Sequence, residues 1–192
     1  MTGIQIAGLA VLATFYAAYF FKMFLQRCHG ITTNQIGAGP KPEHVLRTER
    51  MMKLATYAVV PAELICILWP AQTQSALVCW IGIGVSAIGV LAFILAMAAM
   101  QDSWRAGIPA SDRTELVTTG IYRLSRNPAF LGFDLMYLGL LTAFFHPVHL
   151  LLVISAVIML HLQILQEERF LAATFGESYR TYRKQTGRYF IL

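Results

Sequence analysis

The sequence predicts an all-α polytopic membrane protein, with five transmembrane helices followed by a C-terminal amphipathic helix at the membrane interface. Two observations support this fold class. Of the 192 residues, 57% are hydrophobic and only 13% are charged, whereas a soluble domain carries roughly 25% charged residues. The apolar residues also gather into stretches close to the length of about 20 residues that crosses a bilayer. We expect residues 1–192 to form a single integral membrane domain.

Five apolar stretches predict the spans. The first, Ile4–Leu25, has no basic segment before it and no small-residue cleavage site after it, so we expect a retained span instead of a signal peptide. The other four are predicted at Met51–Pro70, Ala76–Met100, Pro128–Phe145 and Val148–Ile164. Because only His146 and Pro147 separate the last two spans, we expect them to form an antiparallel hairpin.

The basic residues predict the orientation of these spans. All 15 Lys and Arg residues fall in or beside the first connection, in residues 101–127, or after Leu165. Five spans place these three regions on one side of the membrane, and the positive-inside rule makes that side cytoplasmic, with the N-terminus outside. After Leu165 the apolar residues keep a helical period, which predicts an interfacial amphipathic helix, broken near Gly176.

Several binding functions are disfavoured by the same features. The net charge of +5 is accounted for by membrane loops that lie against anionic lipid, so we expect no nucleic-acid partner. Cys28, Cys66 and Cys79 lack the spacing of a metal site or of a disulfide framework. His161 and Glu168 lie seven residues apart without an evident third ligand, so we expect no metal.

Small and ionisable residues inside the spans are a second set of candidates. Gly82 and Gly84 resemble a fragment of a dinucleotide-binding loop, but no strand precedes them. We expect Gly82, Ser86, Ala87 and Gly89 to permit close helix packing instead. Lys53, Glu63 and Asp134 are costly to bury in a bilayer, so each is a candidate either for function or for a contact between helices.

The stretch Leu116–Gly132 lies between two apolar spans and is rich in polar and basic residues. Asn127 and Pro128 predict the start of a helix, because proline is tolerated in the first turn. Arg123 and Arg126 then lie beside backbone N–H groups that the helix start leaves unpaired. This pattern indicates either a cationic edge of a pocket at the membrane surface or a basic juxtamembrane loop.

Glu167 and Glu168 follow shortly after the end of the predicted fifth span. Two carboxylates opposite an arginine cluster suit recognition of a zwitterion or a cation, although they could also be the solvated start of the tail. Adjacent residues of a helix point about 100° apart. We therefore expect only one of the two carboxylates to face a bound ligand.

Ordered motifs in the C-terminal half resemble those of the isoprenylcysteine carboxyl methyltransferase family, a superfamily that includes the phospholipid N-methyltransferases. The motifs are Leu116-Val-Thr-Thr-Gly-Ile-Tyr122, Arg126-Asn-Pro-Ala-Phe-Leu-Gly132, Glu167-Glu168, Phe175-Gly176-x-x-Tyr179 and Arg188. The resemblance covers roughly Trp104 to the C-terminus. The short chain and its few spans are typical of prokaryotic members. The resemblance implies an S-adenosyl-L-methionine cofactor in a cytoplasm-facing pocket, with residues 101–192 carrying the cofactor motifs.

The resemblance also implies individual roles. The cofactor-binding residues would be Leu116, Val117, Gly120, Tyr122, Asn127, Pro128, Ala129, Phe130 and Glu167, and the catalytic residues would be Arg126 and Glu167. Asn127 and Phe130 replace a histidine and a tyrosine of the family pattern. Gln163 replaces an arginine that contacts substrate in the prenylcysteine enzymes, which weakens the case for a prenylcysteine carboxylate.

The function implied is methyl transfer to a lipid-like or isoprenylated small substrate that reaches the cytoplasmic face from the bilayer. Arg126 would bind a carboxylate and Glu167 would orient cofactor or substrate, with positioning as the main catalytic effect. A carboxylate acceptor needs no base, whereas an amine acceptor would lose its proton to Glu167 or Glu168. Two alternatives are a sterol-reductase-like enzyme that uses NADPH and a non-enzymatic small transporter.

Overall fold

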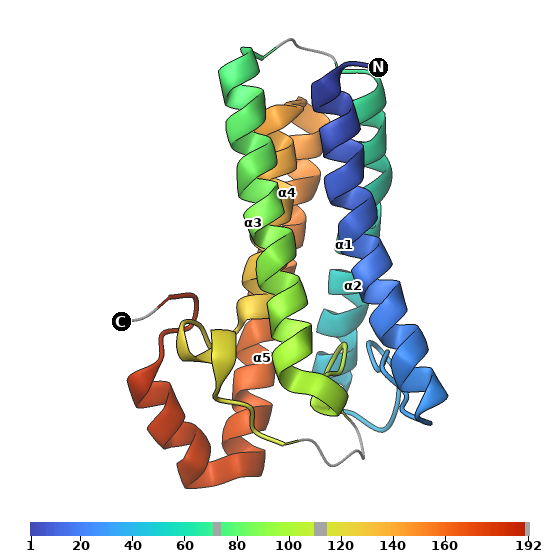
Figure 1. Cartoon of the computed structure of the whole chain (residues 1–192). Coiled ribbons are helices and arrows are strands. Elements are labelled where there is room, and N and C mark those ends of the chain that lie inside the picture. The colour runs from blue at the N-terminus through green and yellow to red at the C-terminus, as the bar shows by residue number, and fades with distance from the viewer. Residues whose placement is uncertain (71–73, 110–114, 191–192) are drawn as a thin grey trace.

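The computed structural model describes residues 1–70, 74–109 and 115–190, and these residues form an all-helical bundle (Figure 1). The elements are α1 (Gly3–Cys28), α2 (Glu43–Leu68), α3 (Ala76–Met100), η1 (Gln101–Ser103), η2 (Gly120–Arg123), α4 (Pro128–Ala143) and α5 (Pro147–Gln185). Within the described residues no strand is present beyond one isolated bridge between Asn34 and Ala106. Four of the helices are long and apolar enough to cross a membrane, and α4 is a shorter apolar helix. The predicted fold class is confirmed.

The helix bounds agree with the prediction at some ends and differ at others. The third span matches α3 at both ends, but α2 begins at Glu43, eight residues before the predicted Met51. The fifth span and the tail form one helix, α5, interrupted at Gly176, where φ is 54° and the backbone leaves the helical region as predicted. In Figure 1 the tail of α5 then turns back toward η2.

The α3–α4 interface is built on small residues. A Cβ atom added to Gly82 would lie 2.5 Å from the carbonyl oxygen of Gly139, and one added to Gly89 would lie 2.7 Å from that of Gly132. The Ser86 hydroxyl donates to the carbonyl of Met136 at 3.1 Å. The predicted close packing is therefore confirmed for these positions. The prediction was wrong for Ala87, which is exposed because it lies on another face of α3.

The bundle has two unlike ends (Figure 1). The N-terminus lies at one end, with the end of α2 and the start of α3. At the other end lie residues 29–42, the described parts of residues 101–127, and the tail of α5. We call this second end the basic end, because it gathers the predicted basic regions. Arg113 lies outside the described residues.

Candidate functional site

A cavity of about 570 Å³ lies between the helices and reaches the basic end. All five helices contribute to its wall, which is mostly apolar and aromatic. Tyr16 of α1 and Tyr137 of α4 line its inner part. Tyr122 of η2, Asn127 and Glu167 line the part nearer the basic end. The cavity therefore runs from the membrane interior to the segment that carries the motifs.

Glu49 holds together the two connections that close the cavity on one side. Its side chain is fully buried and accepts hydrogen bonds from Lys41 Nζ at 2.8 and 2.9 Å. It also accepts from the backbone N–H of Gly37 at 2.6 Å and of Ile108 at 2.9 Å. Ile36 and Ile108, on the two segments joined in this way, line the cavity. No sequence motif marked Glu49, because its partners come from the connection before α2 and from the distant segment around Ile108.

Glu168 organises a second cluster, between the start of α4 and the tail. Its carboxylate accepts from Arg126 at 3.0 and 3.2 Å, from Asn127 Nδ2 at 3.1 Å and from Arg188 at 2.9 Å. Arg126 also donates to the carbonyls of Arg183 at 3.0 Å and Thr186 at 2.8 Å. Arg126 was expected to bind a carboxylate of a ligand, but its guanidinium is already paired with the carboxylate of Glu168.

The pKa of Glu168 reflects this cluster. Burial by itself raises it, but hydrogen bonds from Arg188 and Arg126 outweigh burial and hold the pKa below the ordinary value of 4.5. Glu168 is therefore an ionised carboxylate that ties the tail to α4.

Glu167 faces the cavity instead. Gln163 Nε2 donates to its carboxylate at 3.0 Å, and Glu167 lies beyond the predicted span that ends at Ile164. Burial raises the pKa of Glu167 to about 7, opposed in part by the Gln163 hydrogen bond. Of the two adjacent carboxylates, Glu167 lines the cavity and Glu168 pairs with Arg126; that only one of them faces a bound ligand stays a prediction.

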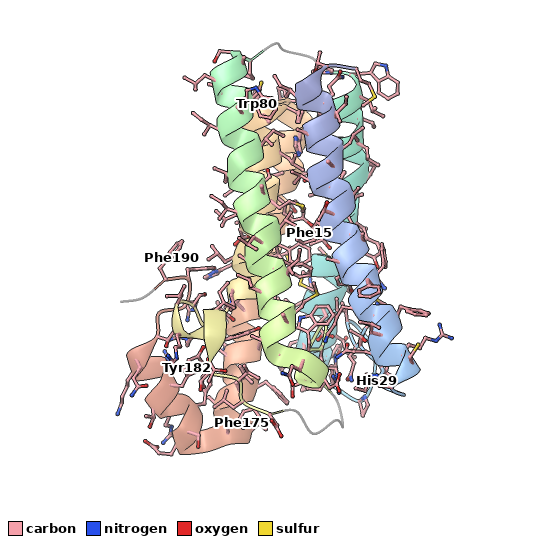
Figure 2. All side chains as sticks on the ribbon, in the orientation of Figure 1. Phe15, His29, Trp80, Phe175, Tyr182 and Phe190 are labelled. Atoms are coloured by element: carbon pink, nitrogen blue, oxygen red, sulfur yellow. The ribbon has the colours of Figure 1, made fainter. Side chains whose placement is uncertain are left out.

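The tail of α5 covers the η2 segment. Tyr179 and Tyr182 form a buried cluster with Tyr122 and Ala96. The Tyr182 hydroxyl donates to the carbonyl of Tyr122 at 2.6 Å, and Figure 2 shows Tyr182 on the side of the tail that faces η2. Gly120 begins η2 with φ of 62°, a left-handed conformation that favours glycine. This turn directs Tyr122 into the cavity wall.

The predicted site residues do not all line the same cavity. The cavity is lined by Tyr122, Arg126, Asn127, Ala129, Phe130 and Glu167. Pro128 is buried at the start of α4. Leu116 lines a separate surface hollow with Phe175 and Tyr182, and Val117 packs against the same buried cluster. Sequence analysis missed Tyr16, Met52 and Trp104 in the cavity wall, because no local pattern marks them.

The ionisable residues of the spans take different positions. Glu63 is fully buried, and both of its oxygens lack a hydrogen-bond partner among the described residues. One carboxylate oxygen of Asp134 is also without a partner there. The Lys53 ammonium lies 5.6 Å from the centre of the Tyr57 ring. His161 interacts with Tyr189, and the described ranges hold no group of three His, Cys, Asp or Glu suited to a metal ion.

Comparison with known families identifies the chain. Residues 77–178 match the profile of the phospholipid methyltransferase family, and this range covers more than half of the sequence. It includes α3 apart from its first residue, η2 and α4, and the part of α5 that carries Gln163, Glu167 and Glu168. A comparison with curated proteins found no match. The chain therefore belongs to the phospholipid methyltransferase family and is an integral membrane methyltransferase.

Proposed function

We propose that the protein transfers a methyl group from S-adenosyl-L-methionine to a lipophilic acceptor that enters the cavity from the bilayer. The observation that carries this proposal is Glu167, a carboxylate with one side-chain partner in an aromatic cavity. A negative charge beside aromatic rings favours a cationic ligand. We further propose one membrane domain whose residues 101–192 supply most of the cofactor site.

The residues present fit the chemistry of this cofactor. Tyr122, Phe130 and Phe170 line the cavity together with Glu167 and suit a sulfonium cation. Gln163 is fully buried and donates to the Glu167 carboxylate, so it holds that carboxylate in place beside the cavity. When bound, S-adenosyl-L-methionine supplies an electrophilic methyl group.

The chain's own residues then position the acceptor and exclude water. The apolar wall shields the reacting groups from water, and the Glu168 cluster fixes the start of α4, where Asn127, Ala129 and Phe130 line the cavity. For an amine acceptor, Glu167 can take the proton, because a pKa of about 7 suits a general base near neutral pH. A carboxylate acceptor needs no such step.

The location of the site follows from charge. We propose that the basic end faces the cytoplasm and that the N-terminus lies outside. Single cysteines introduced at His29 and at His146 test this in a variant that lacks the native cysteines. A membrane-impermeant thiol reagent added outside intact cells should label only the cysteine at position 146. Labelling of position 29 alone would reverse the orientation.

Titration calorimetry with S-adenosylhomocysteine tests the cofactor. We expect binding that a chelator does not change, and no binding of NADPH. Absence of S-adenosylhomocysteine binding would remove the proposal, and binding of NADPH would favour the reductase alternative. Loss of S-adenosylhomocysteine binding when a chelator is added would show that binding needs a metal ion, contrary to the proposal.

A further inference from the structure

The inner end of the cavity carries buried polar groups that no protein group pairs. Tyr16 and Tyr137 both line it. Tyr137 is 0% exposed, and its hydroxyl has no hydrogen-bond partner among the described residues. Tyr16 and Glu63 interact electrostatically with Tyr137, and the Tyr16 hydroxyl approaches that of Tyr137 without the geometry of a full hydrogen bond. Glu63 is likewise 0% exposed with both oxygens unpaired in the described part of the chain.

A purely structural role does not account for this arrangement. Polar groups that tie helices together in a membrane do so through hydrogen bonds, as Ser86 does with Met136. Glu63 and Tyr137 come from two helices, α2 and α4, and interact with each other, yet the carboxylate and the hydroxyl have no hydrogen-bond partner among the described residues. Unpaired polar groups are costly away from water. A ligand group that pairs with them removes this cost.

We infer that the inner end of the cavity is a second recognition site, which binds a neutral hydrogen-bonding group at the far end of the lipophilic acceptor. This inference rests on the proposed function, because it assumes that the acceptor's reacting end lies near Glu167. A hydroxyl or carbonyl group suits the site, since the Tyr137 hydroxyl can donate or accept. A charged group does not, because a charge buried there would lose its water.

The length of the site narrows the class of acceptor. Asn127 and Tyr137 are ten residues apart on α4 and its N-cap, which corresponds to about 15 Å along the helix axis. The acceptor is therefore an elongated molecule with a polar group at each end and an apolar body between them. A lipid with a plain hydrocarbon terminus would leave the tyrosines unpaired.

A pair of probes tests the inference: dodecylamine and its ω-hydroxy analogue, titrated into protein held in phosphatidylcholine nanodiscs. We expect the analogue to bind up to about tenfold more tightly, the upper range for one neutral hydrogen bond. In Tyr137→Phe the two affinities should become equal. Tyr179→Phe is the matched control, because its hydroxyl is also buried and unpaired but does not line this cavity. It should keep the wild-type ratio.

The outcomes separate this inference from the proposed function. Equal affinities in the wild type, or a ratio that Tyr137→Phe leaves unchanged, would overturn the second site even if S-adenosylhomocysteine binds. A preserved ratio without S-adenosylhomocysteine binding would overturn the proposed function alone. Should Tyr137→Phe fail to fold, Glu63→Gln takes its place, with a reduced ratio expected and an unchanged one counting against the site.

Discussion

The two ends of this protein are held together in different ways. Toward the end opposite the basic end, α3 and α4 approach until backbone meets backbone at Gly82 and Gly139. At the basic end, two buried carboxylates, Glu49 and Glu168, each accept hydrogen bonds from three residues. The first region is held by close packing of uncharged residues, and the second by buried carboxylates whose oxygens all accept hydrogen bonds.

The comparison separates carboxylates that hold structure from those that face a ligand. Glu49 and Glu168 have their oxygens fully engaged by protein donors. Glu167 has one side-chain partner, and Glu63 has none among the described residues. Saturation with hydrogen bonds is thus a better guide to role than position in the sequence, since Glu167 and Glu168 are neighbours.

The largest effect is expected for Glu49→Gln. The Lys41 side chain, 3% exposed, would be left without its buried counter-charge. Removing one partner of a buried pair typically costs about 3–5 kcal/mol of unfolding free energy, measurable by denaturant unfolding in detergent. Glu177→Gln is the control, because the Glu177–Arg180 pair is exposed and should change stability little. Equal losses in both variants would break the comparison.

Glu168→Gln should come next, at about 1.5–3 kcal/mol, the range for a hydrogen bond to a charged group. The depressed pKa of Glu168 gives this loss a definite pH dependence. A carboxylate whose pKa is lowered on folding stabilises the protein above its ordinary pKa of 4.5, and that contribution is lost as pH falls through the folded value. Unfolding measured from pH 7 to pH 3 should show the two proteins converging below about pH 4.5. A constant difference would argue against an ionised tie.

For Glu167→Gln the expected change is in turnover. Loss of one charge-assisted contact in the transition state slows methyl transfer roughly ten- to hundredfold. Because folding raises the pKa of Glu167 from its ordinary value of 4.5 to about 7, the folded protein holds the proton more tightly than the unfolded chain. The resulting contribution to stability is fully present below pH 4.5 and is lost as the pH rises through 7. The variant should therefore be at least as stable as the wild type above pH 7, unlike Glu168→Gln. Wild-type turnover would show that Glu167 is only a cavity wall.

The smallest effect tests the other region. Gly82→Ala places a methyl group against the backbone of α4, and overpacking of about 1–3 kcal/mol is partly offset by the better helix propensity of alanine, about 0.5–1 kcal/mol. Gly84→Ala is matched to it, because nothing lies within 4 Å of the added atom, so it should be neutral or slightly stabilising. Thermal unfolding of both variants measures the difference. If Gly84→Ala lowered the stability as much as Gly82→Ala, close packing at Gly82 would not explain the loss.

Most of the fold could be predicted because apolar length and charge placement are local properties of the sequence. The span Ala76–Met100 was predicted to its ends, and so was the break at Gly176. The helix α2 begins eight residues before the predicted span, since residues 43–50 are too polar to register as a span although they are helical. Helical residues outside the apolar core escape a criterion based on hydrophobicity.

The site was predictable only where motifs mark it. Tyr122, Asn127 and Glu167 were named and line the cavity. The partner of Arg126 was not predicted, because sequence reveals a guanidinium but not which of the nearby carboxylates reaches it. Glu49 and Tyr16 were missed as site residues for the same reason: their roles depend on contacts between segments far apart in the chain.

The short α4 has a consequence for the surrounding lipid. Its 16 residues span about 24 Å, against a hydrocarbon thickness of about 30 Å. At its far end Ala143 lies beside Gly82, six residues inside α3, or about 9 Å from the start of that helix. The turn at His146 thus lies short of the start of α3 along the bundle, and thinning of the membrane around it would relieve the mismatch. Hydrophobic mismatch of this kind costs a fraction of a kcal/mol per Å and sorts proteins by bilayer thickness, so the protein should favour thin membranes.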